Sequence, residues 1–115
     1  MHANVFDFSE LLANSTQRYL EFVRVPSFSV GIYVLDSGAL DQQIPHSEDE
    51  VYYVARGRAK MKIGSDNDLR SFNVGPGTII FVPAREHHVF YDITDRLAVL
   101  VFFGPKDSAH HAIPK

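Results

Sequence analysis

The chain has 115 residues, of which 45% are hydrophobic, and it carries a formal net charge of −3 at pH 7. This length suits one domain with a single core, and the acidic balance argues against a nucleic-acid-binding face, which would be basic. Because the chain contains no cysteine, disulfides and thiolate metal ligands are excluded, and a cytoplasmic location is expected. No apolar run approaches the ~20 residues that span a bilayer, and the first eight residues show no signal-peptide pattern.

A short helix is predicted near the start of the chain. Asp7 is a candidate N-cap, and Glu10 follows it by three residues, as in a capping box. Leu11 and Leu12 supply a brief apolar face, and the pattern ends near Asn14. We expect this helical turn to close the open end of a β domain.

From residue 18 onward the hydrophobic pattern has a period of two, which is typical of β-strands. Glycines and prolines interrupt it at roughly even spacing, as in a sandwich or barrel. The segment around Gly57 is predicted to be a tight hairpin, and Asp92 is predicted to begin a turn. The predicted strands are 19–25, 28–35, 50–55, 59–63, 69–74, 78–82, 88–92 and 97–103. The chain is therefore predicted to be one domain, with a lead-in over 1–17, a β-barrel over 18–104 and a tail over 105–115.

Strand periodicity places a carboxylate and a histidine on strand faces that can share one cavity. Glu50 and Tyr52 lie on one face of their strand, and His88 and Phe90 lie on one face of theirs. The neighbouring His87 then points away from the interior. A carboxylate inside a barrel is costly unless it is paired, hydrogen-bonded or bound to a metal.

Three side chains form a candidate metal triad, namely His46, Glu50 and His88. His46 lies just before its strand, where Pro45 keeps the chain extended. Two imidazoles and a carboxylate with open positions suit a catalytic zinc site or a non-haem iron oxygenase. We predict one divalent ion, which would be Fe, Mn, Zn, Ni, Co or Cu. The alternative is a metal-free polar pocket in which Glu50 and His88 hydrogen-bond each other.

The residues around this triad resemble the first motif of the cupin superfamily. That motif reads Gly, five residues, His, one, His, three or four, Glu, six, Gly. Gly38, His46, Glu50 and Gly57 stand at these offsets, and Ile44 replaces the first His. The resemblance implies a metal centre that has lost one of the usual ligands.

A second segment resembles the other cupin motif, which reads Gly, five, Pro, one, Gly, two, His, three, Asn. Gly77, Pro83 and His88 match, while Arg85 and Asp92 replace the second Gly and the Asn. Arg85 suggests an ordinary turn with an exposed side chain. Asp92 could support a ligating imidazole through a hydrogen bond, although the turn is the preferred interpretation.

Gln42, Gln43 and Tyr52 are further candidates for the metal or its pocket. Gln42 shares parity with Ile44 and His46, whereas Gln43 would need a bulge or a bend to point the same way. Either amide could supply an oxygen in place of the missing His. Tyr52 shares the face of the triad carboxylate and is expected to line the cavity.

The cupin resemblance covers roughly residues 28–104 and implies an all-β double-stranded β-helix, or jelly-roll barrel, with a short N-terminal helix. Three functions remain open. The first is a metal-dependent, dioxygenase-like enzyme that acts on a small apolar or aromatic molecule. The second is a non-catalytic metal or small-ligand binding module. The third is a metal-free isomerase-like protein that uses His or Tyr as acid and base.

The expected partners are a small-molecule ligand and a second copy of the chain. Phe6, Phe8, Leu11 and Leu12 precede the barrel, and the apolar strand 19–25 needs a partner for its edge. Cupin relatives often pair through such N-terminal strands, so a homodimer is predicted. No nucleic acid or membrane partner is expected.

Overall fold

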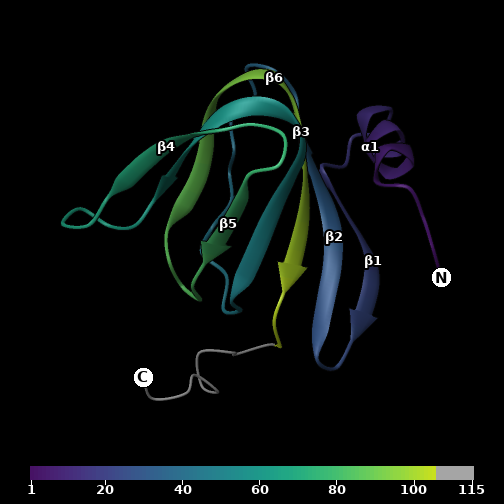
Figure 1. The fold of residues 1–115 in the computed structure, drawn as a ribbon, viewed down its shortest axis with the longest axis horizontal. Helices are drawn as coiled ribbons and strands as arrows, with labels where there is room; N and C mark the ends of the chain where they lie inside the picture. Colours follow the sequence, from purple (N-terminus) through teal and green to yellow (C-terminus); the bar gives the residue numbers. More distant parts are fainter. Residues whose placement is uncertain (106–115) are drawn as a thin grey trace.

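The computed structural model describes residues 1–105, and these form one helix and six strands that pair in antiparallel fashion (Figure 1). The elements are α1 Val5–Ala13, β1 Tyr19–Val25, β2 Phe28–Leu35, β3 Glu50–Ile63, β4 Arg70–Val74, β5 Ile79–Val82 and β6 His88–Phe103. The predicted all-β class with a short N-terminal helix is confirmed. Within this part of the chain, no helix is long and apolar enough to cross a membrane. The predicted tail, apart from Pro105, lies outside the described residues.

The strands β3 and β6 organise the fold because both are long and bent. The sheet order is β1-β2-β6-β3-β4, and β5 pairs with β3. The first part of β3 pairs with β5 and the last part of β6, whereas its last part pairs with β4 and the first part of β6. Both strands arch over one end of the molecule (Figure 1). The same two strands therefore contribute to both layers of the barrel.

The hairpin predicted around Gly57 is wrong, because β3 runs through this position without a turn. Its register against β6 shifts here, Gly57 has φ of 94°, and a Cβ at this glycine would clash with the carbonyl oxygen of Arg96. The turn predicted at Asp92 is also wrong, because β6 continues through it with a local φ of 48°. Glycine and short polar residues inside a strand pattern suit a bulge as well as a turn. Here the bulges let both strands bend.

The helix α1 begins after Asn4 rather than at the predicted cap, Asp7. The Asn4 side chain accepts a hydrogen bond of 2.8 Å from the Phe6 amide, which satisfies one of the unpaired amides of the first turn. Asp7 lies in that turn, where the helix dipole favours negative charge. The buried Leu12 packs against the outer face of the sheet, so α1 does not close the barrel end. The other buried members of this outer cluster are Ile32, Val34 and Ala98.

The main core lies between the two layers and includes Tyr52, Met61, Phe90, Leu97 and Val99. The outer face of β3, β5 and β6 is different, because its apolar side chains are exposed. Tyr53 pairs with Ile79, and Val51 pairs with both Phe81 and Phe102. Ile79 and Phe81 are 70% and 58% exposed. The predicted homodimer stays a prediction.

Candidate metal centre

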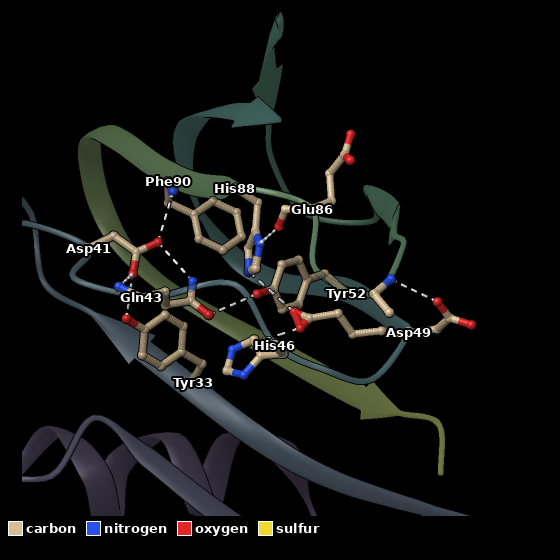
Figure 2. A network of polar contacts seen from close by, with 11 residues as sticks. Tyr33, Asp41, Gln43, His46, Asp49, Tyr52, Glu86, His88 and Phe90 are labelled. Carbon is tan, nitrogen blue, oxygen red and sulfur yellow. Dashed lines mark hydrogen bonds and ion pairs between the residues drawn. The ribbon is translucent and has the colours of Figure 1, made fainter. Parts of the chain in front are cut away.

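The structure brings the three residues of the predicted triad together. Glu50 is the first residue of β3, His88 is the first residue of β6, and His46 lies in the loop before β3. Glu50 pairs with Phe103 and His88 pairs with Ile63, at opposite ends of the β3–β6 pair. These ends meet because both strands bend between them. In Figure 2, His46 and His88 point toward one region.

The carboxylate of Glu50 presents one oxygen to each imidazole. Its Oε1 lies 3.3 Å from His88 Nε2, and its Oε2 lies 3.9 Å from His46 Nε2. One ligand atom from each residue lies within 4.8 Å of the other two. The Glu50 and His88 side chains are 1% exposed, while that of His46 is 32% exposed. The centre is therefore closed on the side of Glu50 and His88 and open on the side of His46.

Three buried polar atoms of this centre lack hydrogen-bond partners within the described residues. Among residues 1–105, neither carboxylate oxygen of Glu50 has a hydrogen-bond partner, and the Nε2 atom of His88 has none either. A buried carboxylate without donors is costly, and its lone pairs face the lone pair of an imidazole. Oxygen and nitrogen donors in this arrangement suit a divalent cation. The residues present therefore fit a metal ion.

The orientation of the His88 ring also suits a ligand. Its Nδ1 lies 3.0 Å from the carbonyl oxygen of Glu86. Because a carbonyl oxygen can only accept, the neutral imidazole carries its proton on Nδ1 and directs the lone pair of Nε2 toward Glu50. Backbone support of this kind fixes the ring of a metal-ligating histidine. The sequence had suggested Asp92 for this role, but Asp92 is 65% exposed and lies 3.6 Å from Lys60 instead.

The loop that carries His46 is fixed by contacts to the segment before β6. The amide of Arg85 donates to the His46 carbonyl at 2.6 Å, and the amide of Ala84 donates to Asp49 at 2.8 Å. The His46 ring packs edge-on against Phe103, with ring centroids 5.2 Å apart. Arg85 has an exposed side chain, as predicted, but its φ of 66° is left-handed rather than that of an ordinary turn. It adopts the conformation for which the cupin motif has glycine.

In the loop before β3, the side chain that points inward is that of Gln43. Ile44, which replaces the first histidine of the cupin motif, does not point inward. Ile44 is 74% exposed, and Gln42 is exposed as well. Gln43 points inward, where its Oε1 accepts a hydrogen bond of 2.9 Å from the Tyr52 hydroxyl. Tyr52 is buried within the core. The parity argument for Gln42 therefore fails, because the loop is irregular between residues 39 and 49.

Asp41 is a residue of this region that the sequence patterns did not reveal. Its carboxylate accepts hydrogen bonds from the Tyr33 hydroxyl at 2.6 Å and the Phe90 amide at 2.9 Å. It also accepts from the backbone amide of Gln43 at 3.3 Å and from its side-chain amide at 2.8 Å. Asp41 thus joins the loop to β2 and β6. No motif or strand period in the sequence marks Asp41, which precedes two further polar residues.

Burial keeps two tyrosines near the centre protonated. Burial raises the pKa of Tyr52 far above its ordinary value, and the charge of Glu50 raises it further. Burial also raises the pKa of Tyr33, together with its hydrogen bond to Asp41. Neither phenol supplies a phenolate at neutral pH.

The pKa of His88 is raised above its ordinary value of 6.5. Burial, the largest single influence, lowers this pKa, but the 3.3 Å contact of His88 Nε2 with Glu50, the Glu86 carbonyl and the negative charges of Glu50 and Asp41 together outweigh it. In the metal-free protein, a proton on His88 is therefore held more tightly than in the unfolded chain.

This shift predicts how the stability of the metal-free protein depends on pH. The pKa of His88 is higher in the folded protein than in the unfolded chain. His88 therefore contributes its full stabilisation at pH values below its unfolded-state pKa, and this stabilisation is lost as the pH rises through its folded-state pKa. We therefore expect the free energy of unfolding of wild type, relative to His88→Gln, to fall between pH 5.5 and pH 8.5. Urea unfolding in the presence of a chelator measures it. Parallel pH profiles for wild type and His88→Gln would contradict the prediction. His87 has an exposed side chain, as predicted, so the control variant His87→Gln should show the same pH profile as wild type.

Comparison with known proteins agrees with this fold. The family model for cupins matches residues 27–115, so the chain belongs to the cupin family. An uncharacterized protein of Streptomyces coelicolor is 43% identical over 90 residues, which cover 78% of this chain and 82% of that protein.

Solved structures share the double-stranded β-helix. An RmlC-like cupin family protein from Methanocaldococcus jannaschii, described as having this fold, superposes with a TM-score of 0.69 at 16% identity, over 86% of this chain and 90% of that one. The iron(II) form of HppE superposes with a TM-score of 0.60 at 20% identity, over 75% of this chain and 48% of that one. At these identities the likeness shows the fold, and the predicted barrel is confirmed.

Proposed function

We propose that this protein is a metal-binding small cupin in which His46, Glu50 and His88 hold one divalent ion. The observation that supports the proposal most strongly is the buried carboxylate of Glu50. Its two oxygens each face an imidazole nitrogen, and neither has a hydrogen-bond partner within the described chain. A divalent cation is the group that would satisfy all three side chains at once.

The chemistry of the centre would be that of a Lewis acid with open positions, because a bound ion supplies polarisation of an oxygen on a small molecule. The chain itself shapes the surroundings. Glu50 and His88 are sealed from water, and the Phe103 ring lies against His46 on the more open side. Tyr52 stays neutral beside them. Aromatic rings and a buried carboxylate together suit a small apolar or aromatic ligand.

Within this proposal, the protein is a dioxygenase-like enzyme or a non-catalytic metal or ligand binder. The iron(II) in the structural relative HppE is consistent with the first reading, but that likeness extends to the fold alone. The metal-free isomerase-like function has less support, because the Tyr52 proton is committed to Gln43 and its raised pKa removes it as a base.

Metal analysis of protein purified without a histidine tag tests the proposal. We expect about one divalent ion per chain in wild type and in His87→Ala, and a loss of most of it in His46→Ala, because a missing ligand typically lowers affinity by orders of magnitude. Equal metal content in all three proteins would reject the triad as the site. Oxygen uptake over a panel of small phenols and diketones then separates an enzyme from a binder.

A further inference from the structure

The chain covers the outer face of its sheet over β1 and β2 but leaves it open over β3, β5 and β6. The helix α1 packs against β2 and β1 (Figure 1), where Leu12 and Phe8 join the outer cluster around Ile32. On the other three strands, the outward side chains are exposed or half-buried. We call this surface the apolar face, and its members are Val51, Tyr53, Ile79, Phe81, Leu100 and Phe102.

The apolar face consists of two cross-strand rows that run from β5 over β3 to β6. The rows are Ile79, Tyr53 and Leu100, and Phe81, Val51 and Phe102. None of these side chains is charged, and the Tyr53 hydroxyl is their single polar group. Paired residues on neighbouring strands point to the same side of a sheet, so the rows form a continuous surface. A surface of this kind suits packing against a second sheet, face to face.

The exposed area of the apolar face matches what a stable dimer needs. Four of its side chains are between 40% and 70% exposed, namely Tyr53, Ile79, Phe81 and Phe102. With about 200 Å² for a whole side chain of this size, they leave about 400 Å² of apolar surface open. A standard interface covers about 800 Å² of each partner, and a little more than half of that area is apolar. The apolar face therefore supplies the core of one such interface.

The apolar face continues into a groove of about 310 Å³, which Leu100 and Phe102 share with the N-terminal segment and β2. The most exposed strand of the face, β5, lies on the opposite side, because β3 pairs with β5 along one edge and with β6 along the other. A two-fold axis that runs along the strands between β3 and β6 would bring Phe81 of each copy over the groove of the other. The surface is therefore complementary to itself, as a closed dimer requires.

The chain has no apolar segment of its own left to cover this face. Phe8 stacks on Phe22, with ring centroids 4.8 Å apart, and the buried Leu12 packs on the sheet. Residues 106–115 contain a single large aliphatic side chain, Ile113, and no aromatic one. A second copy, in contrast, brings an identical apolar surface of equal area.

We propose that the apolar face is the interface of a closed homodimer, with a second copy of this chain as its occupant. The contact then lies on β3, β5 and β6 and not on the N-terminal strand that the sequence pattern indicates. Val51 and Phe102 alternate with Glu50 and Phe103 along their strands, so the interface lies directly behind the candidate metal centre. The dimer does not require the metal ion, because no member of the apolar face is a candidate ligand.

Sedimentation equilibrium of the full-length, metal-free chain at about 10 μM tests this inference. We expect a dimer for wild type and a dissociation constant at least about 100-fold higher for Ile79→Asp, because each dimer would bury the new carboxylate twice. Phe81→Lys introduces the opposite charge and should dissociate the dimer as well. Leu69→Asp changes a similarly exposed side chain just before β4, outside the apolar face, and should stay dimeric. Circular dichroism checks that each variant folds.

The other outcomes would overturn the inference in distinct ways. A monomeric wild type would show that no second copy occupies the face. Dimers that persist in both Ile79→Asp and Phe81→Lys would place the contact elsewhere. Dissociation by Leu11→Asp, at an exposed position of α1, with an intact Ile79→Asp dimer would place it on the N-terminal segment. Equal dissociation by Leu69→Asp and Ile79→Asp would show that the effect is not specific to the apolar face.

Discussion

Saturating divalent metal is expected to raise the melting temperature of the wild-type protein by about 10 °C at pH 7.5. An ion that binds only the folded state at a hundred times its dissociation constant adds about 2.7 kcal/mol to the free energy of unfolding. For a chain of this size, each kcal/mol raises the melting temperature by about 4 °C. His46 and Glu50 come from one segment and His88 from a distant one, so the ion would also join the two ends of the bent strands. Differential scanning fluorimetry with each of the candidate ions measures the rise.

Two substitutions in adjacent residues make this measurement specific. His88→Ala removes a buried ligand and should abolish most of the rise, whereas His87→Ala changes an exposed side chain one residue away and should keep it. The rise in wild type should also shrink at pH 5.5, because protons compete with the metal for His88, whose pKa is raised. An equal rise in the two variants would show that the ion binds elsewhere.

The triad could be predicted because its information is local in the sequence. His46 and Glu50 lie four residues apart at the spacing of one cupin motif, and His88 stands at the spacing of the other. Strand parity then placed Glu50 and Tyr52 on one face, and both are buried. Residue type, spacing and period were sufficient for Glu50, Tyr52 and His88, since each lies on a strand, whereas motif spacing alone indicated His46 in the loop before β3.

The loop before β3 could not be predicted in the same way. Its residues follow no strand period, so the choice between Gln42 and Gln43 depended on a bend that parity cannot describe. What fixes the bend is Asp41, through bonds to Tyr33 and Phe90, and Phe90 is 49 residues away. Such long-range hydrogen bonds leave no spacing pattern in one sequence.

The bulges of β3 and β6 were missed for a related reason. Gly57 and Asp92 carry the residue types of turns, and both have positive φ. Both residue types tolerate positive φ, but the turn predicted at each position was wrong. Whether a positive φ reverses the chain or bends a strand depends on the partner strand, and here both long strands shift register against each other.

The second large effect is expected from Glu50→Gln in the metal-free protein at pH 9. Above the raised pKa of His88, the buried carboxylate of wild type faces the neutral imidazole of His88 and has no hydrogen-bond partner in the described chain. Gln is nearly isosteric and neutral, and its amide can donate to the lone pair of His88 Nε2. We expect the variant to be more stable than wild type by about 2 kcal/mol, and chemical unfolding in the presence of a chelator measures the difference.

This gain should be confined to the metal-free protein at high pH, which distinguishes it from a general improvement in packing. At pH 5.5 the protonated His88 compensates Glu50 in wild type, so the advantage of Glu50→Gln should disappear or reverse. At pH 7.5 added metal should stabilise wild type and leave the variant unchanged, because a neutral amide is a poor replacement for the carboxylate ligand. A variant that is less stable than wild type at pH 9 would mean that the carboxylate is well satisfied without metal. The combination of a carboxylate that lowers stability without metal and that is needed for the metal-induced gain would distinguish a metal centre from a purely structural ion pair.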